Sequence, residues 1–130
     1  MRLCSNMALA AAALALFTGG SAWAQSAADQ QAVAYQSARN QLGVLEYCQD
    51  KGYLDSSAVD TQKKIMTQLP TPSDTSAGDA AEATGRKGTV SSMGQTMDIE
   101  TVSKQRGTTA EAMCKQMGQM LAAAAAQLPK

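Results

Sequence analysis

Apolar side chains recur along this chain at the spacing of amphipathic helices. From Ala32 to Asp50 they are three or four residues apart, which places them on one face of a helix. These positions are Tyr35, Ala38, Leu42, Leu45 and Cys48. The next two residues, Lys51-Gly52, predict the helix end, because glycine readily adopts the left-handed conformation found there. The pattern therefore predicts a helix with Cys48 on its inner face, preceded by frayed chain over residues 25–31.

A second helix is predicted to begin at Asp55 or Ser56, whose side chains can cap backbone amides. Its apolar positions are Val59, Ile65, Met66 and Leu69. Pro70 is expected to end it, because proline cannot continue the helical hydrogen bonds. The short link between the two helices predicts an antiparallel hairpin. The expected fold class is all-α, a small bundle of three to five helices built on this hairpin.

The middle of the chain, about residues 70–96, lacks a strong periodic pattern. Two prolines and several polar residues predict a loop at 70–76, followed by a weak Ala-rich helical turn at 76–84. Gly85, Gly88 and Gly94 then predict irregular chain or one short helical turn. A short helix is expected over 97–106, where Ile99 and Val102 are three residues apart.

The last predicted helix runs from Thr109 to about Gln127. Thr108 and Glu111 match a capping box, in which each side chain bonds to the backbone amide of the other residue. One stripe of this helix carries the apolar residues Met113, Met117, Met120, Leu121, Ala124 and Leu128. Cys114 lies beside the stripe, near the helix start. It is placed to link this helix to the end of the first.

The N-terminal residues have the form of a cleavable export signal. Arg2 precedes an uncharged run from Met7 to Phe17, and small residues at Ala22 and Ala24 match the positions that a signal peptidase reads. A retained membrane helix is the alternative, but this run is about 11 residues long and a span needs roughly 20. We expect a signal over residues 1–24 and one helical domain over 25–130. The mature protein is then periplasmic or secreted.

Removal of the signal changes the charge and cysteine counts. It takes away Arg2 and Cys4, leaving ten basic against eleven acidic residues and two cysteines, Cys48 and Cys114. A net charge of −1 offers no general attraction to nucleic acid. Two cysteines in an exported chain predict one disulfide. On the chain-entropy model, closing this long loop would contribute about 4 kcal/mol to stability.

The residue types argue against an enzyme. The chain contains no histidine, which removes Ser-His and Cys-His nucleophilic chemistry. The carboxylates are scattered at expected helix starts and polar faces, where they complement helix dipoles. The basic turn Gly85-Arg86-Lys87-Gly88 has the form of a nucleic-acid clamp but lacks the strands that such a module needs. We therefore expect no catalytic, cofactor or metal site, no nucleic-acid partner and no small-molecule substrate.

The methionines of the last helix form the strongest candidate site for association. Flexible thioether side chains adapt to different partners, and they also fill gaps in a core. The candidate surface consists of Met113, Met117, Met120, Leu121 and Ala124. Packing against the other helices is the alternative explanation for the same residues.

Several segments resemble a group of small exported proteobacterial proteins. They are Ala38 to Cys48, Gln68-Leu69-Pro70, Gly88-Thr89-Val90, Thr108 to Met117 and Gln127 to Lys130. Such sequences are identified as members of the pore-forming early secretory antigenic target family. The resemblance implies an exported helical hairpin that self-associates and permeabilises membranes. The family's Trp-x-Gly turn is missing here, because the single tryptophan, Trp23, lies in the expected signal and is followed by Ala24 and Gln25.

Together these features predict a non-enzymatic exported protein that acts by association with itself, with a membrane or with another protein. Pore formation is the finer version of this prediction, and it comes from the resemblance. The alternative is a periplasmic stress protein or small chaperone with an adaptable Met-rich surface.

Overall fold

The computed structural model describes residues 26–92 and 94–128, which form five helices and a two-stranded antiparallel sheet. The signal-cleavage residues Ala22 and Ala24 lie outside these ranges. In chain order the elements are α1 (Ala27–Asp50), α2 (Ser56–Met66), α3 (Ser76–Gly85), β1 (Thr89–Ser92), β2 (Gln95–Asp98), α4 (Ile99–Gln105) and α5 (Ala110–Ala125). The protein is therefore mostly helical, as predicted, and the expected all-α class is corrected by one small two-stranded sheet.

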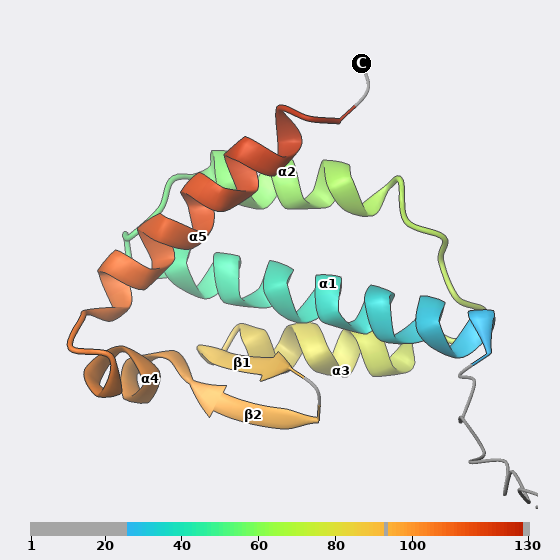
Figure 1. Cartoon of the computed structure of the whole chain (residues 1–130), viewed down its shortest axis with the longest axis horizontal. Coiled ribbons are helices and arrows are strands. Elements are labelled where there is room, and N and C mark those ends of the chain that lie inside the picture. The colour runs from blue at the N-terminus through green and yellow to red at the C-terminus, as the bar shows by residue number, and fades with distance from the viewer. Residues whose placement is uncertain (1–25, 93, 129–130) are drawn as a thin grey trace, which may run out of the picture.

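Helix α1 is the central element, with α2 on one side and α3 and the β-hairpin on the other (Figure 1). It begins at Ala27, so the prediction of frayed chain up to residue 31 is wrong. The reason is a capping box before it: the Asp29 N–H donates to Ser26 Oγ at 3.2 Å, and the Asp29 carboxylate accepts from the Ser26 amide. The helix ends as expected, with Gly52 in the left-handed conformation at φ 75°.

Helix α2 runs back along α1 in the opposite direction (Figure 1). The side chain of Asp55 caps it by accepting from the Ser57 amide at 2.9 Å. It ends at Met66, so Leu69 lies in the loop before Pro70. Five residues of α1, α2 and α5 form a buried group that we call the α2-side cluster: Leu42, Leu45, Ala58, Val59 and Leu121.

The segment expected to be irregular contains a full helix and a hairpin. Helix α3 packs against α1 at a distance that only glycine permits, because a Cβ built on Gly43 would lie 2.1 Å from the Glu82 carbonyl oxygen. On the other side of the contact, a Cβ on Gly85 would lie 2.3 Å from the Asn40 carbonyl oxygen. The weak Ala-rich helix is thus stabilised by close backbone packing, which a sequence period does not reveal.

The hairpin pairs Thr89 with Asp98 and Ser92 with Gln95, and Gly94 in its turn has φ 76°. The outer edge of β1 is covered by a side chain of α1. The Asn40 amide nitrogen donates to the Thr89 carbonyl at 3.1 Å, and the Asn40 side-chain oxygen accepts from the Ser91 amide at 2.8 Å. The Asn40 carboxamide thus occupies the position of a peptide group in a neighbouring strand.

Helices α4 and α5 pack against α1 and complete the core. Asp98 caps α4 through the Thr101 amide at 3.0 Å, and Ile99 is fully buried. Thr109 caps α5, while Glu111 pairs with Lys115 at 2.6 Å, so the capping box predicted between Thr108 and Glu111 is not formed. A second buried group, the disulfide cluster, joins these helices to α1 and contains Val44, Cys48, Ile99, Ala110 and Cys114.

Candidate functional site

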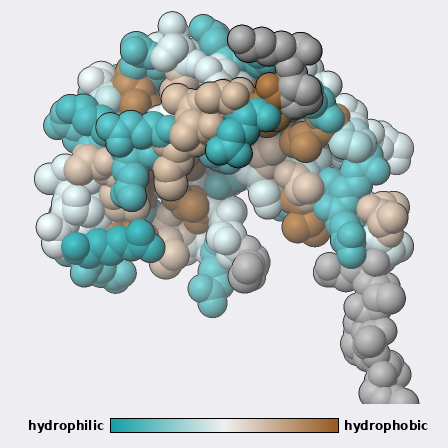
Figure 2. All heavy atoms as spheres, turned by 45° about the horizontal axis from the view of Figure 1, so that its top comes forward, coloured by the Kyte–Doolittle hydropathy of each residue, from teal (hydrophilic) through white to brown (hydrophobic). Residues whose placement is uncertain are grey.

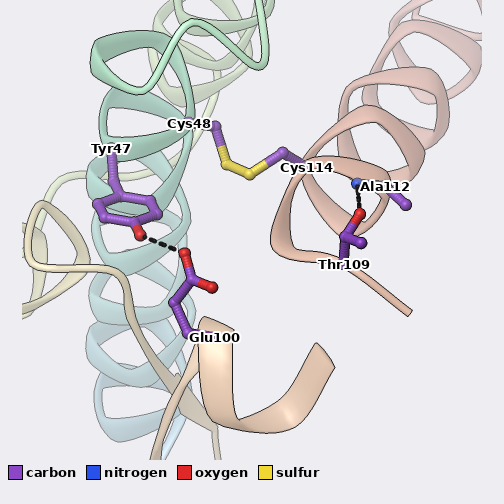
Figure 3. The surroundings of a disulfide bond; sticks show 6 residues. All are labelled: Tyr47, Cys48, Glu100, Thr109, Ala112 and Cys114. Carbon is purple, nitrogen blue, oxygen red and sulfur yellow. Dashed lines mark hydrogen bonds between the residues drawn. A yellow bond between two sulfur atoms is a disulfide. The ribbon is translucent and has the colours of Figure 1, made fainter. Parts of the chain in front are cut away.

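The disulfide joins the last turn of α1 to the start of α5, as predicted (Figure 3). Cys48 and Cys114 have Cα atoms 5.8 Å apart, and neither residue is exposed to solvent. Reactive cysteines are partly exposed and lie in electropositive surroundings, whereas this pair lies among Val44, Ile99 and Ala110. The arrangement is that of a structural cross-link.

Tyr47, next to the disulfide, is tied to α4. Its hydroxyl donates to Glu100 at 3.1 Å (Figure 3). Burial, and then the hydrogen bond to Glu100, raise the pKa of Tyr47 to about 12. One face of the ring lies near Gly88, where an added Cβ would be 3.0 Å away, and the Lys51 ammonium lies 5.5 Å from the ring centroid. The hydrogen bond to Glu100 joins α1 to α4, and the contact with Gly88 joins α1 to the turn before β1.

The five residues of the candidate association surface have different surroundings. Leu121 is buried in the α2-side cluster. Met113 and Met117 are partly buried and pack against the core. Met120 is 60% exposed and Ala124 is exposed. Core packing therefore explains Met113, Met117 and Leu121. Met120 and Ala124 are exposed and are the residues of this surface that a partner could contact.

The far half of α5 is the most open apolar part of this helix. Ala122, Ala123 and Ala124 are all exposed, although they belong to a regular helix that continues to Ala125. A helix can persist there because alanine has the highest helix propensity. Figure 2 shows apolar groups of this face of the molecule interspersed with hydrophilic side chains. None of the helices in the described part of the chain is long and apolar enough to cross a membrane.

A groove of about 310 Å³ lies between α2 and α5, beside this open half. Leu54, Ala58 and Leu121 supply its apolar lining, and Gly118 lies under the Leu54 side chain, with an added Cβ 3.0 Å from it. Asp55 and Lys115 are the charged residues of its lining. Its volume is at the lower end of the range of ligand pockets.

A larger hollow of about 700 Å³ lies between α1 and the hairpin. Its lining carries no charged residue and comprises Val33, Gln36, Ser37, Asn40, Ser91, Ser92, Gly94 and Thr96. Asn40 is 2% exposed, and its amide group is fully used by the backbone of α3 and β1. The hydroxyl and amide groups around it offer hydrogen bonds but no acid–base pair.

An ion-pair network links α1 and α3, and the sequence patterns did not predict it. Glu82 is 8% exposed and lies between two arginines, with Arg39 Nε at 2.7 Å and Arg86 Nη2 at 2.5 Å. Arg86 also bonds to Glu46, which raises the pKa of Arg86 above its ordinary value. Gly43, an isolated glycine within the first helical pattern, is the sequence feature that could have indicated such a close helix contact.

The basic turn Gly85-Arg86-Lys87-Gly88 is part of this network. Arg86 caps the end of α3 and forms ion pairs with Glu46 and Glu82, and Gly88 is packed against Tyr47.

Among the residues that the structure describes, no group of three or more His, Cys, Asp or Glu side chains could hold a metal ion.

Comparison of the chain with protein-family models, with curated proteins and with solved structures gives no match. The resemblance to the pore-forming family stays a prediction. Function is therefore inferred from α5 and its surroundings.

Proposed function

We propose that the protein is a non-enzymatic association protein that binds a helical partner through α5. The observation that carries this proposal is the strip formed by Met113, Met117, Met120 and Ala124. These residues are spaced four, three and four apart, so they share one helix face, and their exposure rises from partly buried to open along it. One end of this strip packs against the core and the other end is exposed. The folded protein therefore presents apolar surface to a partner.

Alanine at the far half of α5 favours a helical partner. Small side chains allow two helix backbones to approach closely, and the α1–α3 contact at Gly43 and Gly85 shows this mode of packing within the protein itself. Met120 adds a flexible side chain that adapts to the shape of the opposing surface. A second copy of the chain is the partner we favour, because self-association is also what the family resemblance implies.

The finer version of the proposal is that the associated form permeabilises membranes after export. The disulfide supports the location, since such cross-links persist in oxidising compartments such as the periplasm or the exterior. We therefore place the mature protein there.

The test compares Met120→Glu with Gln119→Glu, because Gln119 is not three or four residues from any member of the strip. Both residues are exposed on α5, so both variants add the same charge to the same helix. Molar mass by light scattering across a concentration series reports self-association, and dye release from vesicles of neutral or anionic lipid reports permeabilisation. We expect the wild type to self-associate, Met120→Glu to be monomeric and Gln119→Glu to resemble the wild type.

A wild type that stays monomeric, or equal effects of the two variants, would contradict self-association through α5. Self-association without dye release would reject only the pore.

A small chaperone is the second candidate. The observation that favours it is that three methionines of α5 lie on one face, two against the core and one exposed. Suppression of light scattering by an aggregating client at low pH or after oxidation tests it. A protein that leaves client aggregation unchanged under both conditions would exclude this role.

A further inference from the structure

Met117 lies where the two buried clusters of the core meet. It and Leu54 are the partly buried apolar side chains that pack against both the α2-side cluster and the disulfide cluster. By contrast, Met66 packs only against the α2-side cluster and Met113 only against the disulfide cluster. The apolar side chain of Met117 therefore connects the α2-side cluster to the disulfide cluster.

The remaining described methionines lie outside both clusters. Met97 on β2 is 46% exposed and Met120 on α5 is 60% exposed. A polar change at either position leaves the core contacts intact. The same chemical change at different methionines should thus have different structural consequences.

Helix α5 is attached to the rest of the protein unevenly. Its start is held covalently, through the bond of Cys114 to Cys48. After Lys115, its buried or partly buried apolar side chains that pack against the clusters are Met117 and Leu121, and Ala122, Ala123 and Ala124 are exposed. Loss of one of these two contacts should release the far half of the helix and leave its start in place.

Oxidation of a methionine side chain removes a packing contact of this kind. Hypochlorous acid transfers its oxygen to the thioether sulfur; the sulfur loses two electrons, and the chlorine leaves as chloride with release of a proton. The product, a sulfoxide, is polar and disrupts apolar packing. The described cysteines are joined in the disulfide, which leaves them without a free thiol that would react first.

We propose that Met117 is an oxidation-sensitive modification site whose conversion to the sulfoxide releases the part of α5 after Lys115, while the disulfide keeps the helix start attached. Release takes Leu121 out of the α2-side cluster and Met117 away from it, which exposes part of the remaining cluster. The inference goes beyond the proposed association, because it concerns the packing of α5 against its own chain, and it is measured at a protein concentration at which light scattering shows the monomer.

The sequence offers a cleavage site at the required position. Lys115 is followed by no other lysine or arginine until Lys130, so trypsin acting after Lys115 yields the fragment 116–130. In the folded protein Lys115 lies within α5 and pairs with Glu111 at 2.6 Å. Cleavage there requires local opening of the helix.

The experiment treats the protein with graded hypochlorous acid, maps each sulfoxide by mass spectrometry, and follows the rate of cleavage after Lys115. In the wild type we expect this rate to rise about tenfold or more with formation of the Met117 sulfoxide, because an unpaired polar group has entered the core. Reduction by methionine sulfoxide reductases should restore the slow rate.

Three variants separate the sites. Met117→Leu keeps a similar apolar volume and cannot be oxidised, so its cleavage rate should stay slow after treatment. Met120→Leu and Met113→Leu should both behave like the wild type.

The inference is overturned if Met117→Leu opens as readily as the wild type, or if the opening depends on Met113 instead. Rapid cleavage of the untreated wild type would also overturn it, because α5 would then not be docked beforehand. Should Met117→Leu fail to fold, the wild type still decides the test, because the cleavage rate must then follow the Met117 sulfoxide and not the sulfoxide of Met113 or Met120.

Discussion

Gly43 of α1 and Glu82 of α3 touch backbone to backbone: a Cβ on Gly43 would lie 2.1 Å from the carbonyl oxygen of Glu82 and 2.9 Å from the amide nitrogen of Arg86. Both neighbouring atoms belong to the main chain of another helix, which cannot move aside as a side chain can. This contact sets the distance between α1 and α3. It thereby positions the arginines and Glu82 for their ion pairs.

Gly43→Ala should destabilise the protein by about 3 kcal/mol, because overpacking against a backbone outweighs the gain of about 1 kcal/mol in helix propensity. Gly118→Ala is the matched control, since its nearest neighbour is the flexible end of the Leu54 side chain at 3.0 Å. We expect the control to be neutral or stabilising. Urea unfolding of both variants measures the difference, and equal stabilities would contradict the close contact.

Asn40→Ala should cost about 3 kcal/mol, because it removes three hydrogen bonds, those to the Ala81 and Thr89 carbonyls and from the Ser91 amide, in a buried or part-buried setting. Gln62→Ala removes a single hydrogen bond, to the Ala38 carbonyl, and should cost about 1 kcal/mol. Amide hydrogen exchange gives the local result: the Ser91 amide should lose protection in Asn40→Ala and keep it in Gln62→Ala.

Cys48→Ser and Cys114→Ser should each lower the free energy of unfolding by about 4 kcal/mol, since the bond closes a long loop. The double variant should be no less stable than either single one, because both remove the same cross-link. Thermal melting under non-reducing conditions tests this. Single variants that melt like the wild type would show that the bond adds nothing to stability.

Tyr47 should make the protein lose stability at high pH. Its folded pKa of about 12 exceeds the ordinary value of 10.0, so between these values the unfolded state releases the phenolic proton and the folded state keeps it. The contribution is therefore complete below pH 10 and declines as the pH rises toward 12. Tyr47→Phe should be less stable than the wild type at pH 8 and should show a smaller decline above pH 10. Denaturant unfolding at both pH values compares them, and an equal decline in the two proteins would point to other groups.

Local sequence features predicted much of the helical framework. The periodic positions Leu42, Leu45 and Cys48 lie on the buried face of α1, and Asp55 and Gly52 cap the helices where expected. These predictions succeeded because helix period, capping and left-handed glycine depend on residues a few positions apart. The pairing of Cys48 with Cys114 was also predictable, because removal of the expected signal leaves only two cysteines.

The candidate site was predicted less completely. The sequence placed Met113, Met117, Met120 and Leu121 on one stripe, but it did not distinguish the buried Leu121 from the exposed Met120. That distinction depends on where α5 crosses α2 (Figure 1) and how far it extends beyond the core. No periodic pattern within one helix contains this information.

The sequence by itself determined which segments are able to form helices and which two cysteines are able to pair. Only the tertiary structure decided that residues 89–98 form a hairpin and that Met117 joins two clusters. The hairpin depends on Asn40, which is about fifty residues away along the chain, and the role of Met117 depends on contacts with α1 and α2. The physical reason is that local hydrogen bonds select helix and turn, whereas packing between distant segments selects which surfaces are buried and which stay open.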